Sequence, residues 1–100
     1  MLRPPRNAWM AALVALFIAG AGFWFGISMT EWCLVVLAYA AVWMAETFNT
    51  ALEILADAMT RDFHPLLRDA KDAAAGAVLI TVIGAVIIGL FVFGPYVLRL

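Results

Sequence analysis

Two long stretches without a charged residue restrict the fold of this chain more than any other feature. They cover 7–30 and 73–98, and each exceeds the roughly 20 residues that a helix needs to cross the hydrocarbon core of a bilayer. The 100 residues are 67% hydrophobic and 13% charged, with a mean hydropathy of +1.04. A soluble domain of this size cannot bury so many apolar side chains. The composition therefore excludes a soluble globular protein, a disordered chain and a nucleic-acid-binding protein with a basic face.

The hydropathy pattern predicts an all-α integral membrane protein with a single membrane domain, 1–100. Its three transmembrane helices are expected at about 7–25, 31–59 and 66–93. Ser28-Met29-Thr30-Glu31 has the form of a capping box, so the second helix should begin there. Gly94-Pro95 is expected to end the third helix, because proline is poorly tolerated inside helices.

The basic residues predict the orientation of the chain in the membrane. Five of the six flank the N-terminus and the connection between the second and third helices, namely Arg3, Arg6, Arg61, Arg68 and Lys71. The positive-inside rule then places the N-terminus in the cytoplasm and the C-terminus outside. Arginines before an apolar run also fit a signal peptide, but this run continues through Phe23-Trp24-Phe25, which favours a membrane span.

Nine of the thirteen charged residues, and the only histidine, lie in one polar window, 46–72. On the second helix the polar window contains Glu46, Asn49, Glu53 and Asp57, which share an arc of about 80°. Glu46 is expected about 22 Å from Glu31, inside the hydrocarbon core. Because a carboxylate there is costly, at roughly 2.5 to 3.5 kcal/mol for Asp, a functional role is favoured. An interhelical hydrogen bond or ion pair is the alternative.

The third helix opens with Arg68, Lys71 and Asp72 on one face. Considered alone, these residues are typical of a first helical turn that is exposed to water. At the same depth as the carboxylates of the second helix, they predict a site for phosphoryl transfer. Carboxylates hold Mg²⁺ together with phosphate oxygens, lysine neutralises phosphate charge, and a carboxylate near a lipid head group can act as a general base. The sequence has no glycine-rich phosphate-binding motif, so any nucleotide site is of another kind.

Three segments of the polar window carry a family resemblance. They are Glu46-Thr-Phe-Asn49-Thr-Ala-Leu-Glu53, His64-Pro65-Leu66 and Ala70-Lys71-Asp72-Ala-Ala-Ala-Gly-Ala-Val-Leu79. Together they resemble the signature of the small prokaryotic diacylglycerol kinase / undecaprenol kinase family. The resemblance implies a homotrimer of three-helix subunits in the bacterial inner membrane, with active sites shared between neighbouring subunits at the cytoplasmic interface. It also implies transfer of a phosphoryl group from ATP, with Mg²⁺, to the hydroxyl of a long-chain lipid alcohol or diacylglycerol.

The resemblance also implies roles for individual residues. Glu46 would be the general base, with Asn49 beside it in the catalytic site. Contacts to the nucleotide would come from Glu53, His64, Lys71 and Asp72. Glu53 would also be a metal ligand, and Asp57 and Arg68 would support the site. The motifs favour undecaprenol over diacylglycerol as the acceptor, and no nucleic-acid partner is expected.

The N-terminus departs from the family pattern. Family members begin with an amphipathic surface helix and a metal-ligand glutamate before the first span, and Pro5 stands about where that glutamate belongs. The departure leaves open a catalytically impaired or accessory membrane protein that keeps the trimer fold. An ion or proton carrier built on Glu46 is a further alternative, but it does not explain Lys71 and Asp72 at one depth.

Overall fold

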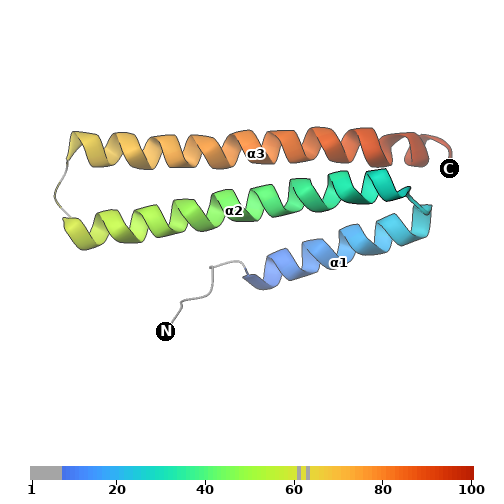
Figure 1. The fold of residues 1–100 in the computed structure, drawn as a ribbon, viewed down its shortest axis with the longest axis horizontal. Helices are drawn as coiled ribbons and strands as arrows, with labels where there is room; N and C mark the ends of the chain where they lie inside the picture. Colours follow the sequence, from blue (N-terminus) through green and yellow to red (C-terminus); the bar gives the residue numbers. More distant parts are fainter. Residues whose placement is uncertain (1–7, 61, 63) are drawn as a thin grey trace.

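The computed structural model describes residues 8–60, 62 and 64–100, which form three helices. They are α1 (Ala8–Phe25), α2 (Met29–Met59) and α3 (Pro65–Leu98). Helices α2 and α3 lie side by side and antiparallel (Figure 1), and the shorter α1 lies against the half of this pair that is distant from the α2–α3 connection. The elongated molecule measures 54 × 28 × 19 Å.

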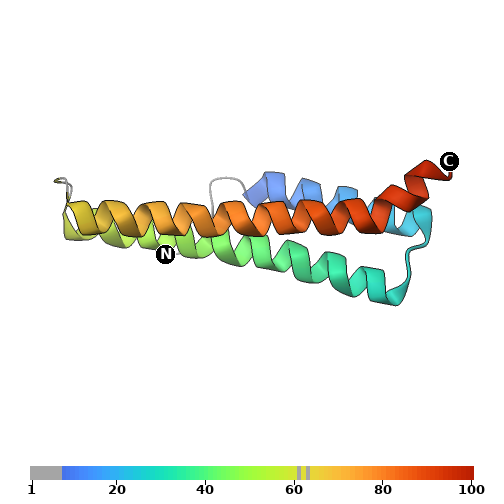
Figure 2. The same cartoon turned by 90° about the horizontal axis from the view of Figure 1, so that it is seen from above.

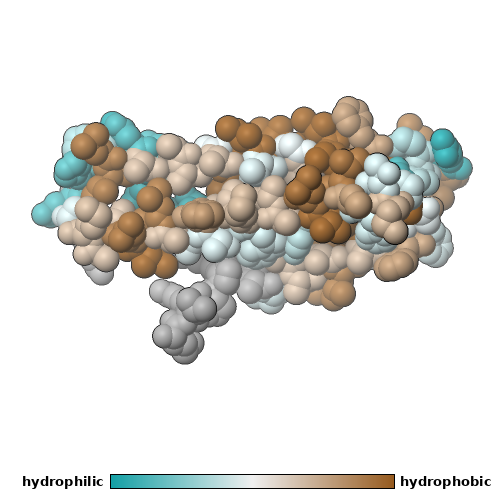
Figure 3. All heavy atoms as spheres, in the orientation of Figure 1, coloured by the Kyte–Doolittle hydropathy of each residue, from teal (hydrophilic) through white to brown (hydrophobic). Residues whose placement is uncertain are grey.

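Most large apolar side chains of the described residues face outward. Among the described residues, the buried hydrophobic side chains are those of Ile27, Val35, Ala56 and Val92. Helices α2 and α3 are each long and apolar enough to cross a membrane, and α1 is a shorter apolar helix. Hydrophilic atoms gather at the two ends of the molecule, and hydrophobic atoms cover much of the middle (Figure 3). This surface matches the profile of a bilayer, in which apolar side chains need no cover from water.

Local hydrogen bonds make the turn between α1 and α2. Gly26 has a φ of 64°, and the N–H of Ile27 donates to the carbonyl of Gly22 at 3.1 Å, as in a Schellman motif. The predicted capping box is confirmed: the hydroxyl of Ser28 accepts from the N–H of Glu31, whose carboxylate accepts from the N–H of Ser28. These bonds pair main-chain groups that the two helix ends would otherwise leave free.

Gly22 allows α1 to approach the indole ring of Trp32 on α2. A Cβ at position 22 would meet Cη2 of that ring and lie 2.7 Å from its Cζ2 atom. The ring also packs against Phe23, with centroids 5.1 Å apart, so it has little room to move. The small side chain at position 22 is thus a condition for the close packing of this corner.

We expect Gly22→Ala to lower the free energy of unfolding by about 1 to 3 kcal/mol, because the new methyl group overpacks the corner. Thermal unfolding in detergent measures the change. Gly20→Ala is the matched control, because no heavy atom lies within 4 Å of a Cβ placed there. It should leave stability unchanged or raise it by about 0.5 to 1 kcal/mol. Equal stability of the two variants would show that the indole ring moves aside freely.

The prediction that α3 ends near Phe93 is wrong. The helix continues through Pro95 to Leu98. Proline removes one helical hydrogen bond and its ring crowds the preceding turn, which bends a helix without ending it when other contacts hold the next turns. The last part of α3 changes direction accordingly (Figure 2).

Contacts from Tyr96 hold the end of α3 against the other two helices. Its hydroxyl donates to Oε1 of Glu31 on α2 at 2.6 Å. Its ring stacks on Phe25 of α1, with centroids 5.6 Å apart and planes at 29°. These contacts join residues far apart in the sequence and compensate for the hydrogen bond that Pro95 lacks.

Candidate active site

Glu46 lies at the end of an apolar groove that the three helices enclose. The groove has a volume of about 650 Å³, and Glu46 is its only charged lining residue in the described part of the chain. The lining on α2 includes Tyr39, Trp43 and Glu46, which follow one another at helical spacing. The carboxylate is thus the polar end of a space suited to a hydrocarbon chain.

Asn49 lies on α2 beyond Glu46, toward the α2–α3 connection. The residue is half-buried, and its Oδ1 atom is buried without a hydrogen-bond partner among the described residues. Buried polar atoms are rarely left unpaired in native proteins. This oxygen is therefore suited to accept from a donor outside the described residues, such as the hydroxyl of a bound molecule.

A second, polar pocket of about 440 Å³ lies where α2 and α3 connect. Its lining consists of Ala56, Asp57, Thr60, Asp62, His64, Leu67, Arg68 and Lys71. The ammonium of Lys71 donates to Oδ1 of Asp57 at 3.0 Å, which joins α3 to α2. The side chain of Lys71 is 38% exposed and that of Asp57 60%. Such exposed pairs stabilise proteins by only about 0 to 1 kcal/mol, so the main consequence is the orientation of Lys71.

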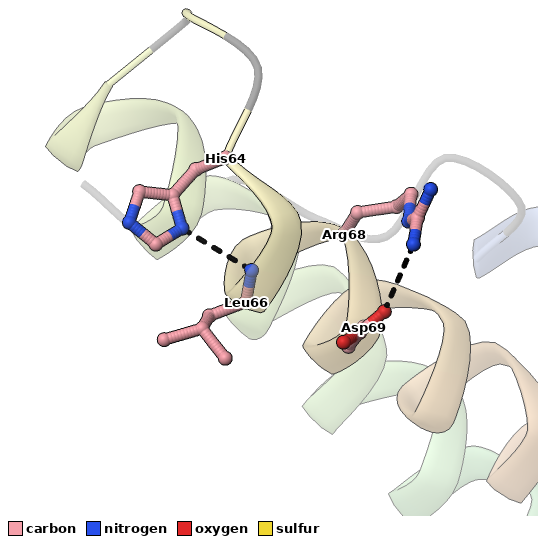
Figure 4. A network of polar contacts seen from close by, with 4 residues as sticks. All are labelled: His64, Leu66, Arg68 and Asp69. Carbon is pink, nitrogen blue, oxygen red and sulfur yellow. Dashed lines mark hydrogen bonds and ion pairs between the residues drawn. The ribbon is translucent and has the colours of Figure 1, made fainter.

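The structure places the predicted site residues in the apolar groove, in the polar pocket or outside both. Glu46 lies in the apolar groove, and Asp57, His64, Arg68 and Lys71 line the polar pocket. Glu53 and Asp72 are exposed and line neither space. The guanidinium of Arg68 also lies 3.5 Å from the carboxylate of Asp69 (Figure 4).

His64 caps the N-terminus of α3. Its Nδ1 atom accepts from the N–H of Leu66 at 3.2 Å (Figure 4), and Pro65 occupies the first helical position. The ring pairs a main-chain donor that the helix itself leaves free, as Asn and Asp side chains commonly do. His64 thus has a structural role beside any contact to a ligand in the polar pocket.

Removal of this cap provides a test of the two roles. We expect His64→Ala to lower the free energy of unfolding by about 0.5 to 2 kcal/mol, and His64→Asn to restore most of it. Thermal unfolding gives the stability, and the KM for MgATP reports contact with the nucleotide. If the cap were its only role, His64→Asn would behave as wild type in both measurements.

The donor set fits Mg²⁺ as part of a nucleotide complex. Among residues 8–60, 62 and 64–100, no three His, Cys, Asp or Glu side chains converge to hold a metal ion. Glu53 nevertheless offers an exposed carboxylate on α2 between Asn49 and Asp57. Mg²⁺ commonly takes one or two carboxylates and completes its shell with water and substrate phosphates. The side chains of a single chain are therefore suited to bind Mg²⁺ only as part of a complex with the nucleotide.

Some features of the site were not predicted from the sequence. Tyr39 and Trp43 line the groove, and Thr60 and Asp62 line the polar pocket. The helical spacing from Tyr39 to Glu46 was a usable signal, whereas nothing local distinguishes Thr60. The hypothesis about Pro5 lies outside the described residues, and so do three of the basic residues used for orientation, namely Arg3, Arg6 and Arg61.

Together, these features define a class of protein. The structure combines helices able to span a membrane, a carboxylate at the end of an apolar groove and a nearby pocket with an oriented lysine. This combination is suited to an integral-membrane enzyme that acts on a lipid. More narrowly, the chain belongs to the prokaryotic diacylglycerol kinase family, whose sequence profile matches residues 1–93. It is accordingly a lipid kinase, that is, a phosphotransferase.

The curated relatives are named after two different lipid substrates, undecaprenol and diacylglycerol. The chain is 39% identical to the undecaprenol kinase of Bacillus subtilis (strain 168) over 93 residues, which are 93% of this chain and 76% of that protein. It is 33% identical to a diacylglycerol kinase of Escherichia coli (strain K12) over 82 residues, which are 82% of this chain and 65% of that protein. A diacylglycerol kinase of Synechocystis is 44% identical over 57 residues, 56% of this chain and 33% of that protein. No solved structure matches the chain significantly.

Proposed function

We propose that this chain phosphorylates the hydroxyl of a membrane lipid, with ATP as donor and Mg²⁺ as cofactor. The observation that carries the proposal is the position of Glu46 as the only charged lining residue, in the described part of the chain, of an apolar groove. The polar pocket with Lys71 lies further along the same pair of helices. A lipid tail in the groove and a nucleotide at the pocket would approach each other along α2.

Glu46 acts as the general base in this proposal. Its carboxylate takes the proton of the lipid hydroxyl as the oxygen attacks the γ-phosphorus of ATP, and ADP leaves. Asn49, whose Oδ1 atom lacks a partner among the described residues, positions the acceptor hydroxyl or the nucleotide. The apolar groove holds the tail, so that the hydroxyl is presented to Glu46.

The nucleotide is held by the charged ends of α2 and α3. Lys71, oriented by Asp57, neutralises phosphate charge, with His64 and Arg68 in the same pocket. Asp72 adjoins Lys71 on α3, and Glu53 lies about 10 Å from Glu46 along α2. Glu53 would hold the Mg²⁺ that is bound with ATP, and the ion would supply positive charge against the phosphates.

The proposal also covers the acceptor lipid, the oligomeric state of the protein and its location in the cell. Undecaprenol is favoured over diacylglycerol, because the undecaprenol kinase of Bacillus subtilis is 39% identical over 93% of this chain. The diacylglycerol kinase of Escherichia coli is 33% identical over 82% of the chain, and that of Synechocystis, at 44%, matches over only 56% of it. The protein would form a homotrimer in the bacterial inner membrane, with the N-terminus cytoplasmic and the C-terminus outside. The outward-facing apolar surface supports the membrane location, and the distribution of basic residues supports the orientation. Neighbouring subunits would then provide a donor for the Oδ1 atom of Asn49 where the lipid does not.

A transfer assay tests the proposal. The purified full chain in lipid micelles receives γ-labelled ATP, Mg²⁺ and either undecaprenol or diacylglycerol. Labelled lipid is expected with at least one acceptor, more with undecaprenol, and none when EDTA removes the metal. An intact oligomer that transfers no label to either lipid would instead favour the catalytically impaired or accessory protein.

A further inference from the structure

Helix α1 forms one wall of the groove and contacts α2 at few points. At the outer corner, Gly22 packs against Trp32. Nearer to Glu46, the hydroxyl of Tyr39 on α2 donates to the carbonyl oxygen of Ala11 in the first turn of α1 at 2.5 Å. Within the described part of the chain, this is the one hydrogen bond that we find between helices α1 and α2 beyond their connecting turn.

Tyr39 lies in the groove itself. Tyr39 and Ala11 both line it, so their hydrogen bond crosses from one wall to another. The ring of Tyr39 contacts that of Trp43, with centroids 6.3 Å apart, and Trp43 is followed along this face by Glu46. Helix α1 runs beside α2 over this part of the molecule (Figure 1). This bond therefore ties α1 to α2 across the groove.

We infer that Tyr39 is a specificity-determining residue for the acceptor lipid, which it controls by positioning α1. The inference rests on the proposed function, in which the lipid tail occupies the groove. The lining on α2 extends from Val35 to Glu46, about 16 Å, along one face of the helix. A hydrocarbon chain lying along this lining would bring its terminal hydroxyl to Glu46. With the bond intact, α1 stays close to α2 and a two-chain lipid fits less well.

Tyr39→Phe removes the bond and keeps the aromatic ring. We expect the ratio of kcat/KM for a single-chain polyprenol to that for diacylglycerol to fall about threefold to tenfold, which is the range that loss of one hydrogen bond produces. The KM for MgATP should stay constant, because the polar pocket is not lined by Tyr39. Tyr96→Phe is the matched control: it removes a tyrosine hydrogen bond to Glu31 outside the groove and should leave the ratio unchanged.

A second measurement needs no activity. Spin labels are placed at Leu13→Cys on α1 and Met44→Cys on α2, both exposed positions, in a Cys33→Ala background. The distribution of distances between the labels should broaden in Tyr39→Phe and not in Tyr96→Phe. An unchanged distribution, or an unchanged acceptor ratio in an active enzyme, would overturn the inference. Wild-type protein that phosphorylates neither lipid would instead contradict the proposed function and with it the role of Tyr39 in acceptor specificity, whereas the label distances would still show whether Tyr39 positions α1.

Discussion

Replacing Glu46 with glutamine is expected to lower kcat for lipid phosphorylation by about 10²- to 10⁴-fold, the contribution typical of a general base. The amide has nearly the shape of the carboxylate, so the apolar groove keeps its volume, but it cannot take the proton of the acceptor hydroxyl. The KM for MgATP should change little, because Glu46 lines the groove and not the polar pocket. Steady-state kinetics with the better of the two acceptors measures both quantities.

Asp69→Asn is the matched control for this experiment. It also removes one carboxylate, but Asp69 is exposed, lines neither space and contacts Arg68 only at 3.5 Å. It should retain nearly full activity. Glu46→Gln protein with kcat within fivefold of wild type, and with the same oligomeric state, would show that another group takes the proton.

The second large effect is expected at Lys71. Lys71→Met keeps most of the side-chain volume and removes the ammonium that would face the phosphates. We expect kcat/KM for MgATP to fall by about 10²-fold, in line with the loss of one donor that stabilises developing charge. The KM for the lipid should be unaffected, because Lys71 lines the polar pocket and not the groove. Titrations of MgATP at saturating lipid measure the change.

Asp57→Asn separates the charge of Lys71 from its ion pair. This variant removes the negative charge opposite Lys71, keeps an oxygen that can accept a hydrogen bond, and leaves the ammonium in place. Because the pair is exposed and orients Lys71, we expect a loss of tenfold or less in kcat/KM for MgATP, about the equivalent of 1.4 kcal/mol. A loss as large as that of Lys71→Met would mean that the pair acts as a unit.

Local sequence patterns predict most of the residues of the site. They do not predict how these residues are divided between the apolar groove, the polar pocket and the exposed surface. The helical period places Glu46, Asn49, Glu53 and Asp57 in one arc of α2, but the structure leaves two half-buried and two exposed. Their burial depends on where α1 and α3 cross α2. In the same way, Gly94-Pro95 predicted the end of α3 from local rules, whereas the distant contacts of Tyr96 extend the helix to Leu98.

Taken alone, the sequence determined a membrane protein of apolar helices, the capping box at Ser28, the polar window and the motifs that relate it to lipid kinases. Those features follow from hydropathy and from hydrogen bonds that act over a few residues. Only the tertiary structure decided that Asp57 meets Lys71 and that Glu46 ends a groove which Tyr39 spans. The ion pair, the groove and the bond across it depend on how helices distant in the sequence pack together, and local patterns carry little information about that packing.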